Sequence, residues 1–266
     1  RYNLAGASVG DYALFAGGYS SGGYRNTVDA YNASLVRSTP TALSATRYDL
    51  AGASVGNYAL FAGGSAGSSS YRNTVDAYNT SLVRSTPTAL SVAKNCLAGA
   101  SVGNYALFAG GYDGSSYRDT VDAYNTSLVR STPTALSVAR TLLVGASVGN
   151  YALFAGGYDD SDRNTVDAYN ASLVRSTPTA LSVGRYNLAG ASVGDYALFA
   201  GGSAGGTRWD TVDAYNASLV RSTPTALSVA RRQLAGASVG DYALFAGGYD
   251  GSYRNTVDAY TPQISV

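Results

Sequence analysis

The phrase Tyr-Ala-Leu-Phe-Ala-Gly-Gly occurs six times in this chain of 266 residues, and its recurrence constrains the fold more than any other feature. Successive copies are separated by 46, 47, 46, 45 and 46 residues. A fixed period of this size indicates one supersecondary unit copied in tandem. Such a unit cannot bury its own apolar faces, so the copies are expected to pack on one another. The glycine pairs that end the phrase are Gly17/Gly18, Gly63/Gly64, Gly110/Gly111, Gly156/Gly157, Gly201/Gly202 and Gly247/Gly248.

Each repeat contains four short segments bounded by Gly, Asn, Ser or Pro. In the second repeat they are residues 50–55, 58–62, 74–78 and 88–92. Their lengths and boundaries are typical of strands, and none has the length or the period of a helix. Because short turns join them, the sequence predicts an antiparallel meander of four strands in every repeat.

Six such sheets can form a linear stack or a closed ring. The first segment of each repeat consists mainly of Ala, Gly and Ser, as expected where six strands converge on a crowded axis. A ring also leaves only short, protected edges. The sequence therefore predicts an all-β fold, a six-bladed β-propeller of four-stranded antiparallel blades, as a single domain over residues 1–266. The predicted blades are 1–46, 47–93, 94–139, 140–184, 185–230 and 231–266.

The last repeat is shortened. Its Pro262 comes two residues after Tyr260, whereas in the first repeat Pro40 comes nine residues after Tyr31. Either a fourth strand survives without its preceding loop, or the sixth blade has three strands. In both cases we expect blade six to pack on blade one, and local opening to begin at that seam. The sequence opens at a repeat boundary, as an excised domain would.

The repeat resembles that of the kelch family. An apolar strand ends in Gly-Gly, a variable loop follows, then Val-Asp-Ala-Tyr, and a final strand leads to Arg. The resemblance covers essentially the whole chain and implies a propeller that binds its ligand at one rim. One departure is that kelch repeats usually carry a Trp a few residues after the Tyr, where this chain has Leu35-Val36-Arg37-Ser38. We expect aliphatic side chains to replace the packing of that Trp.

A repeated Asp lies in the middle of the third strand, where a buried carboxylate needs a partner. We expect a repeated Asp–Arg network, with a ring of carboxylates that binds a cation as the alternative. The carboxylates are Asp29, Asp76, Asp122, Asp167, Asp213 and Asp258. One basic set precedes them, namely Arg25, Arg72, Arg118, Arg163, Arg208 and Arg254. The other follows the fourth strand, namely Arg47, Lys94, Arg140, Arg185 and Arg231.

Composition limits the classes of partner and of chemistry. The net charge is +1, from 18 basic and 17 acidic residues, and no basic block exists, so we expect no nucleic-acid binding. The apolar runs are too short to span a membrane. With no His and Cys96 as the single Cys, we expect no metal, no cofactor and no internal disulfide. The variable position of Cys96 indicates drift rather than a reactive thiol. We expect a monomer.

Two repeated sequence features have a structural explanation. The Gly pairs end strands and no helix follows them, so they indicate special backbone angles rather than a phosphate loop. The repeated Asn-x-Ser pattern matches an N-glycan acceptor, but Asn in a tight turn accounts for it. Its Asn residues are Asn32, Asn79, Asn125, Asn170 and Asn216.

Nearly all the variation between the repeats falls in the segment between strands two and three and in the connection between repeats. In a four-stranded meander these segments emerge at the same end of the blade, so they define one variable rim. The rim is rich in Tyr, which gives a large contact area at low entropic cost, although relaxed constraint on exposed loops would also produce variation. The candidate ligand-binding residues are Tyr2, Tyr19, Tyr48, Tyr112, Asp113, Tyr158, Asp159, Tyr186, Trp209, Arg232, Tyr249 and Asp250.

These observations predict a non-enzymatic binding or scaffold module for a protein or glycan ligand, with no catalytic residue. One alternative is an engineered or reconstructed repeat protein without a natural ligand, which the near-identity of the copies favours. Unequal repeat lengths and scattered Asp/Asn and Ala/Thr exchanges argue against that alternative. The other alternative is a glycan-processing enzyme, which would have to work with Asp, Tyr and Arg alone.

Overall fold

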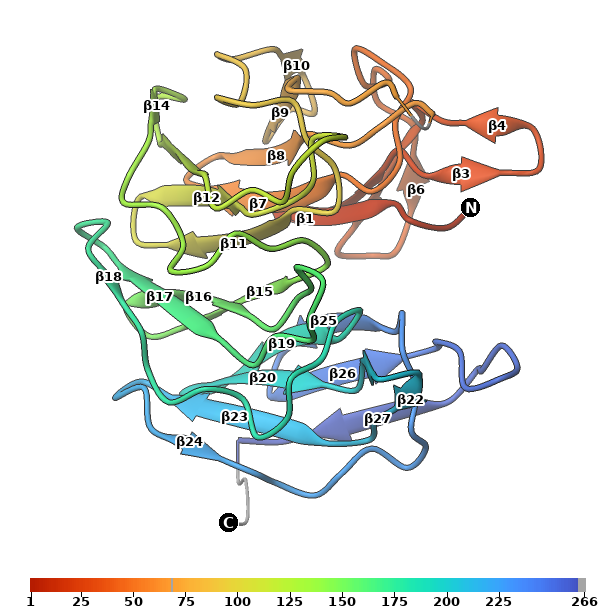
Figure 1. The fold of residues 1–266 in the computed structure, drawn as a ribbon. Helices are drawn as coiled ribbons and strands as arrows, with labels where there is room; N and C mark the ends of the chain where they lie inside the picture. The colour runs from red at the N-terminus through yellow and green to blue at the C-terminus, as the bar shows by residue number, and fades with distance from the viewer. Residues whose placement is uncertain (68, 263–266) are drawn as a thin grey trace. The chain divides into compact units, whose positions relative to one another are not determined.

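The computed structural model describes residues 1–262 apart from residue 68, and these residues form strands, turns and loops (Figure 1). Within that part of the chain no helix is long and apolar enough to cross a membrane. The fold class is the predicted one, an all-β propeller with six blades. The sheets run in sequence order as antiparallel meanders, for example β1-β2-β5-β6 and β11-β12-β13-β14.

The strands repeat at equivalent positions. The first strands are β1 (Ala5–Val9), β7 (Ala51–Val55), β11 (Ala98–Val102), β15 (Val144–Val148), β19 (Ala189–Val193) and β25 (Ala235–Val239). The second are β2 (Tyr12–Ala16), β8 (Tyr58–Ala62), β12 (Tyr105–Ala109), β16 (Tyr151–Ala155), β20 (Tyr196–Ala200) and β26 (Tyr242–Ala246). The third are β5 (Val28–Asn32), β9 (Val75–Asn79), β13 (Val121–Asn125), β17 (Val166–Asn170), β23 (Val212–Asn216) and β27 (Val257–Tyr260).

The fourth strands are only two residues long. They are β6 (Arg37–Ser38), β10 (Arg84–Ser85), β14 (Arg130–Ser131), β18 (Arg175–Ser176) and β24 (Arg221–Ser222). The sixth blade has three strands among the described residues, and the segment that could supply a fourth, residues 263–266, lies outside them. Two small hairpins, β3 (Tyr19–Ser20) with β4 (Gly23–Tyr24) and β21 (Ser203–Ala204) with β22 (Thr207–Arg208), extend the first and fifth repeats.

The predicted position of the fourth strand was wrong. The strand precedes Pro87 rather than following it, and residues 88–92 form no strand. The chain reverses within a tight turn, in which Leu82 N–H donates to the Asn79 carbonyl oxygen at 2.8 Å and Leu82 has φ 60°. Arg84 is thereby brought back beside Tyr78. Residues 88–92 are then free to leave the sheet and pack on the next blade.

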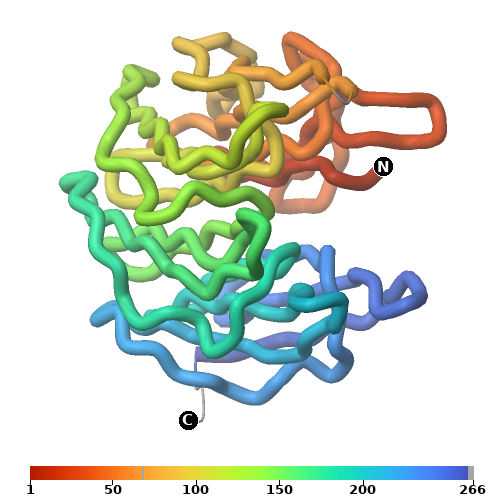
Figure 2. Tube along the Cα trace, viewed as in Figure 1, coloured from red at the N-terminus to blue at the C-terminus, as the bar shows by residue number. Residues whose placement is uncertain are grey.

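The chain consists of two compact units, Arg1–Thr141 and Leu142–Val266, which follow one another along the Cα trace (Figure 2). Each unit holds three repeats. In the first unit β7 contacts β1 and β11, and in the second β19 contacts β15 and β25. These first strands approach so closely that a Cβ on Gly52 would overlap the carbonyl oxygen of Gly6. The prediction that small residues line the first strands for steric reasons is therefore confirmed within each unit. The closure of blade six on blade one stays a prediction.

The core of each unit lies between neighbouring blades. Leu14, Val28 and Leu43 of the first repeat cluster with Phe61 and Tyr78 of the second. The second and third strands are in register so that each Phe pairs with the Asp of the third strand, as Phe61 does with Asp76. This arrangement places a charged residue at the centre of each sheet, where it must be neutralised.

Candidate functional site

The variable segments of a repeat lie side by side. Tyr2 pairs with Tyr19, with N–O distances of 3.0 and 2.9 Å, so the connection entering the first blade joins its second-to-third-strand segment. Equivalent pairs join the two segments in four other repeats, namely Tyr48 with Ser65, Asn95 with Tyr112, Tyr186 with Ser203 and Arg232 with Tyr249. In these blades the variable rim is therefore a continuous structural feature, as predicted.

Tyrosine rings form a cluster on the rim of the first unit. The Tyr19 ring lies 5.4 Å from that of Tyr2 and 5.2 Å from that of Tyr24. Tyr24 in turn stacks on Tyr48 of the second repeat, with centroids 5.2 Å apart and planes inclined by 23°. Tyr2 remains 58% exposed. The cluster thus joins two blades and presents aromatic surface to solvent.

A second group of rings connects the next two blades of that unit. Tyr71 lies 6.0 Å from Tyr112, which lies 5.6 Å from Tyr117. Tyr24 and Tyr71 were missing from the predicted site, yet each of these rings contacts a ring of the following repeat. The signal that could have identified them is their position, because a Tyr ends the variable segment directly before Arg in four repeats, at Tyr24, Tyr71, Tyr117 and Tyr253.

The rim of the second unit combines aromatic and cationic side chains. Tyr158 and Tyr186 lie 5.5 Å apart. The guanidinium groups of Arg208 and Arg232 lie 5.3 and 5.9 Å from the centre of the Tyr249 ring. A cation within about 6 Å of an aromatic face is attracted by the ring quadrupole. Arg232 and Tyr249 of the predicted site are therefore in contact.

Trp209 occupies a different place from the rim tyrosines. Its backbone N–H donates to the Gly202 carbonyl oxygen at 3.0 Å, and its carbonyl oxygen accepts from the backbone N–H of Arg231 at 3.1 Å. Arg72 makes the two equivalent backbone hydrogen bonds in the second repeat. Trp209 therefore corresponds to the repeated Arg that follows the variable segment. Arg208 pairs with Ser203 and takes the place of the preceding Tyr. The predicted membership of Arg208 in that basic set was wrong, because the fifth repeat places it one residue earlier.

The rim carboxylates hold their own loops. Asp113 accepts hydrogen bonds from the backbone N–H groups of Ser115 at 2.9 Å and Ser116 at 2.8 Å and forms an ion pair with Arg118. Burial raises the pKa of Asp113, but Arg118 and these N–H groups outweigh it and the net pKa is lowered. Asp159 pairs with Arg163 and Asp250 with Arg254 in the same way. Consequently these carboxylates stiffen the rim.

The predicted Asp–Arg network around the strand-three carboxylates is present, and the structure shows which basic residues form it. Asp76 is fully buried and receives Arg47 Nη2 at 2.6 Å and Arg84 Nη1 at 3.3 Å. Arg47 also donates to the carbonyl oxygens of Phe61, Gly63 and Thr74 at 3.1, 3.2 and 2.6 Å. Burial lowers the pKa of Arg47 to about 10, against the attraction of Asp76.

The same arrangement recurs in the second unit, where Asp213 receives Arg185 at 2.7 Å and Arg221 at 2.8 Å. The basic set after the fourth strand is therefore the partner, whereas Arg118, Arg163 and Arg254 of the other set bind rim carboxylates. Within the described residues no group of three or more His, Cys, Asp or Glu side chains is arranged to hold a metal ion. Asp76 and Asp213 each form ion pairs with two Arg side chains.

The variable residue that opens each blade adopts a left-handed backbone conformation. Asn3, Asp49 and Cys96 have φ of 54°, 53° and 50°. The backbone N–H of Asp49 donates to the Asn3 carbonyl oxygen at 3.0 Å, and that of Cys96 donates to the Asp49 carbonyl oxygen at 2.9 Å. Burial raises the pKa of Asp49 to about 6, although hydrogen bonds with Cys96 and Asn3 lower it. Burial also raises the pKa of the Cys96 thiol, which disfavours the thiolate.

The structural explanations of the Asn and Gly repeats are confirmed. Asn79 Oδ1 accepts from the N–H groups of Ser81 at 3.0 Å and Val83 at 2.9 Å, and the four equivalent Asn residues do the same in their turns. Gly111 has φ 109°, and a Cβ there would lie 2.7 Å from the Asn95 carbonyl oxygen.

No known family model matches this chain, and a comparison with curated proteins found no match either.

Proposed function

We propose that this protein is a non-enzymatic binding module that presents its variable rim to a protein or glycan ligand. The observation that carries the proposal is that, in five of the repeats, the segments that differ most between repeats pair with one another at one end of the blade. The resemblance of the repeat to that of the kelch family favours the same end, because kelch propellers commonly bind there.

Aromatic chemistry also favours this rim. The rings of Tyr19, Tyr24 and Tyr48 are held against one another, so little side-chain entropy remains to be lost on binding. The ion pair of Asp113 with Arg118 stiffens the neighbouring loop. Stiff Tyr-rich surfaces bind through large, preorganised contact areas rather than through single charges.

Catalysis is not part of the proposal. The carboxylates of Asp76 and Asp213 are buried in ion pairs, and those on the rim are bound by their own loops. The thiol of Cys96 is kept protonated by burial and by the nearby Asp49 carboxylate. None of these groups is both accessible and activated.

A glycan array and a pull-down experiment with Tyr112→Ala and Trp209→Ala test the proposal. Tyr112 contacts two other rings on the rim, so the Tyr112→Ala substitution should abolish binding of the main ligand or lower the affinity for it at least tenfold. Trp209 takes the position of the repeated Arg after the variable segment, so its replacement should have a smaller effect. Tyr242→Ala is the matched control, because Tyr242 is 49% exposed and begins its strand at the end opposite the rim.

An unchanged binding profile for Tyr112→Ala would refute the proposal. Absence of any ligand for the unaltered chain would favour an engineered or reconstructed repeat protein. Turnover of a glycan, lost on replacing one rim Asp or Tyr, would favour a glycan-processing enzyme.

A further inference from the structure

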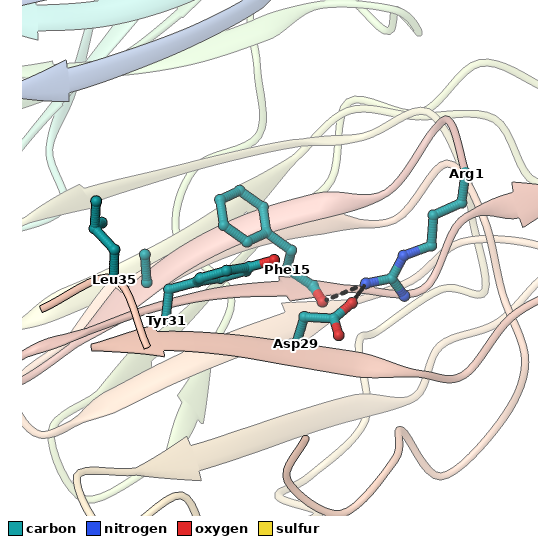
Figure 3. Close-up of a pocket in the computed structure, with 6 residues that line it drawn as sticks. Arg1, Phe15, Asp29, Tyr31 and Leu35 are labelled. Atoms are coloured by element: carbon teal, nitrogen blue, oxygen red, sulfur yellow. Dashed lines mark hydrogen bonds and ion pairs between the residues drawn. The ribbon is translucent and has the colours of Figure 1, made fainter. Parts of the chain in front are cut away.

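Positive charges in this chain are repeatedly paired with carboxylates, but two cations on the rim of the second unit are not. In the first blade, for comparison, the Arg1 guanidinium is directed at Asp29 (Figure 3), which also receives Arg37 at 2.6 Å. Arg208 and Arg232 make no ion pair with any residue in the described part of the chain. Both side chains are half-buried, so their charges are partly shielded from water.

The two guanidinium groups lie close to one another because both contact the same ring. They are 5.3 and 5.9 Å from the centre of the Tyr249 ring. The Nε atoms of Arg208 and Arg232 are buried, and neither has a hydrogen-bond partner among the described residues. Two neighbouring like charges repel, and an unpaired buried donor costs free energy. A bound oxyanion would relieve the repulsion and provide acceptors for these groups.

The carboxylates of the same blade are bound to other cations. Asp250 forms an ion pair with Arg254, which holds the pKa of Asp250 below its ordinary value. Asp258 receives Arg231 at 2.7 Å. Neither carboxylate is therefore available to neutralise the two unpaired cations beside the Tyr249 ring.

The equivalent positions of the first unit show that the fold does not need these charges. Arg208 takes the place of Tyr24, and Arg232 takes the place of Tyr48. The Tyr24 and Tyr48 rings stack on one another, with centroids 5.2 Å apart and planes inclined by 23°. The fifth and sixth repeats thus carry two cations where the first and second repeats carry two uncharged rings.

The surroundings of the two cations favour a carbohydrate over a peptide. Peptides that add to a sheet edge bind through free backbone groups. Here the backbone groups bond to one another, since Arg232 and Tyr249 pair at 3.1 and 2.9 Å and Arg254 N–H donates to the Gly248 carbonyl oxygen at 2.9 Å. Recognition at this place therefore relies on side chains. The Tyr253 ring, 5.5 Å from Tyr249 and 92% exposed, offers a flat apolar face for a sugar ring beside the charges.

We propose that Arg208 and Arg232 form an anion-binding subsite of the rim that takes an acidic carbohydrate. The carboxylate or sulfate group of the sugar binds the guanidinium groups, and a sugar ring lies against Tyr253. The inference rests on the proposed function, because the subsite is part of the variable rim, and it specifies the ligand as an anionic glycan.

Fluorescence anisotropy of labelled oligosaccharides with the full chain tests the proposal. The probes are an oligogalacturonate, a sulfated heparin fragment and a neutral galactose oligomer of the same length. At least one acidic probe should bind saturably, with an affinity that falls as salt is added, and the neutral probe should not bind. Arg208→Gln and Arg232→Gln should each lower the affinity at least tenfold, because a charge-assisted hydrogen bond is lost. The double variant Arg208→Tyr/Arg232→Tyr copies the first unit, so it should fold and lose binding.

Arg37→Gln is the matched control, since it removes the same charge from a side chain that is 57% exposed on the fourth strand of the first blade, and the affinity should not change. No saturable binding of either acidic probe, or equal affinity for the Arg208 and Arg232 variants, would overturn the proposal. Binding of an oligoglutamate peptide in place of both acidic probes would overturn the assignment to a carbohydrate. A main ligand that is lost in Tyr112→Ala but kept in both Arg variants would overturn this inference alone, whereas absence of any ligand would refute the proposed function as well.

Discussion

Lys94 stands where the equivalent repeats have Arg47, Arg140, Arg185 or Arg231, and this exchange allows the buried network to be tested in both directions. Lys94 Nζ donates to the Thr120 carbonyl oxygen at 3.0 Å and to its hydroxyl at 2.8 Å, and lies 3.7 Å from Asp122. Arg47 makes its ion pair at 2.6 Å and reaches two further carbonyl oxygens, those of Phe61 and Gly63. Lys94→Arg should add the equivalent bonds to Phe108 and Gly110.

Two added hydrogen bonds at about 1 kcal/mol each should raise the free energy of unfolding by about 2 kcal/mol. For a unit of this size that is a rise in Tm of roughly 4–8 °C. Arg47→Lys is the reverse exchange and should lower the free energy of unfolding by a similar amount. Urea unfolding of both variants gives the midpoint and the slope, and the slope should stay unchanged.

The pH dependence gives an independent measurement. Burial lowers the pKa of Lys94 to about 8, against the attraction of Asp122. Above that pH the folded chain loses a proton that the unfolded chain keeps, so stability rises with pH by about 2 kcal/mol between pH 8 and 9.5. In Lys94→Arg this rise should be absent below about pH 10. A Lys94→Arg variant that is less stable, or an Arg47→Lys variant of unchanged stability, would refute the role assigned to the carbonyl contacts.

Two further substitutions test the backbone and the buried acid at the blade entrance. Gly111→Val should destabilise the protein by roughly 1–3 kcal/mol, because φ is 109° and the new Cβ would meet the Asn95 carbonyl oxygen; unaltered thermal unfolding would contradict this. Asp49, with its pKa raised to about 6 by burial, binds more protons when folded, so its contribution to stability falls as pH rises from about 4 to 6. Asp49→Asn should therefore stabilise by up to about 3 kcal/mol at pH 8 but not at pH 4; equal urea midpoint shifts at both pH values would contradict this.

The sequence alone determined the repeat and the first three strands of each blade. The period, the Gly pairs and the short turns predicted six antiparallel blades, because these features depend on local backbone preferences and the same residues recur in every repeat. The role of Asn79 in its turn and the position of the two variable segments at the same end of a blade could be predicted for the same reason, since both depend on residues close together in the repeat. The first strands also follow from it, since only small residues fit beside Gly6 and Gly52.

Contacts between residues far apart in the chain were decided by the tertiary structure. Residues 88–92 have the composition of a strand, yet Leu90 leaves its own sheet to be buried against the next blade. The choice of Arg47 rather than Arg72 as the partner of Asp76 depends on which guanidinium reaches the centre of the sheet. Sequence spacing cannot report that distance, because both cations recur with the same period.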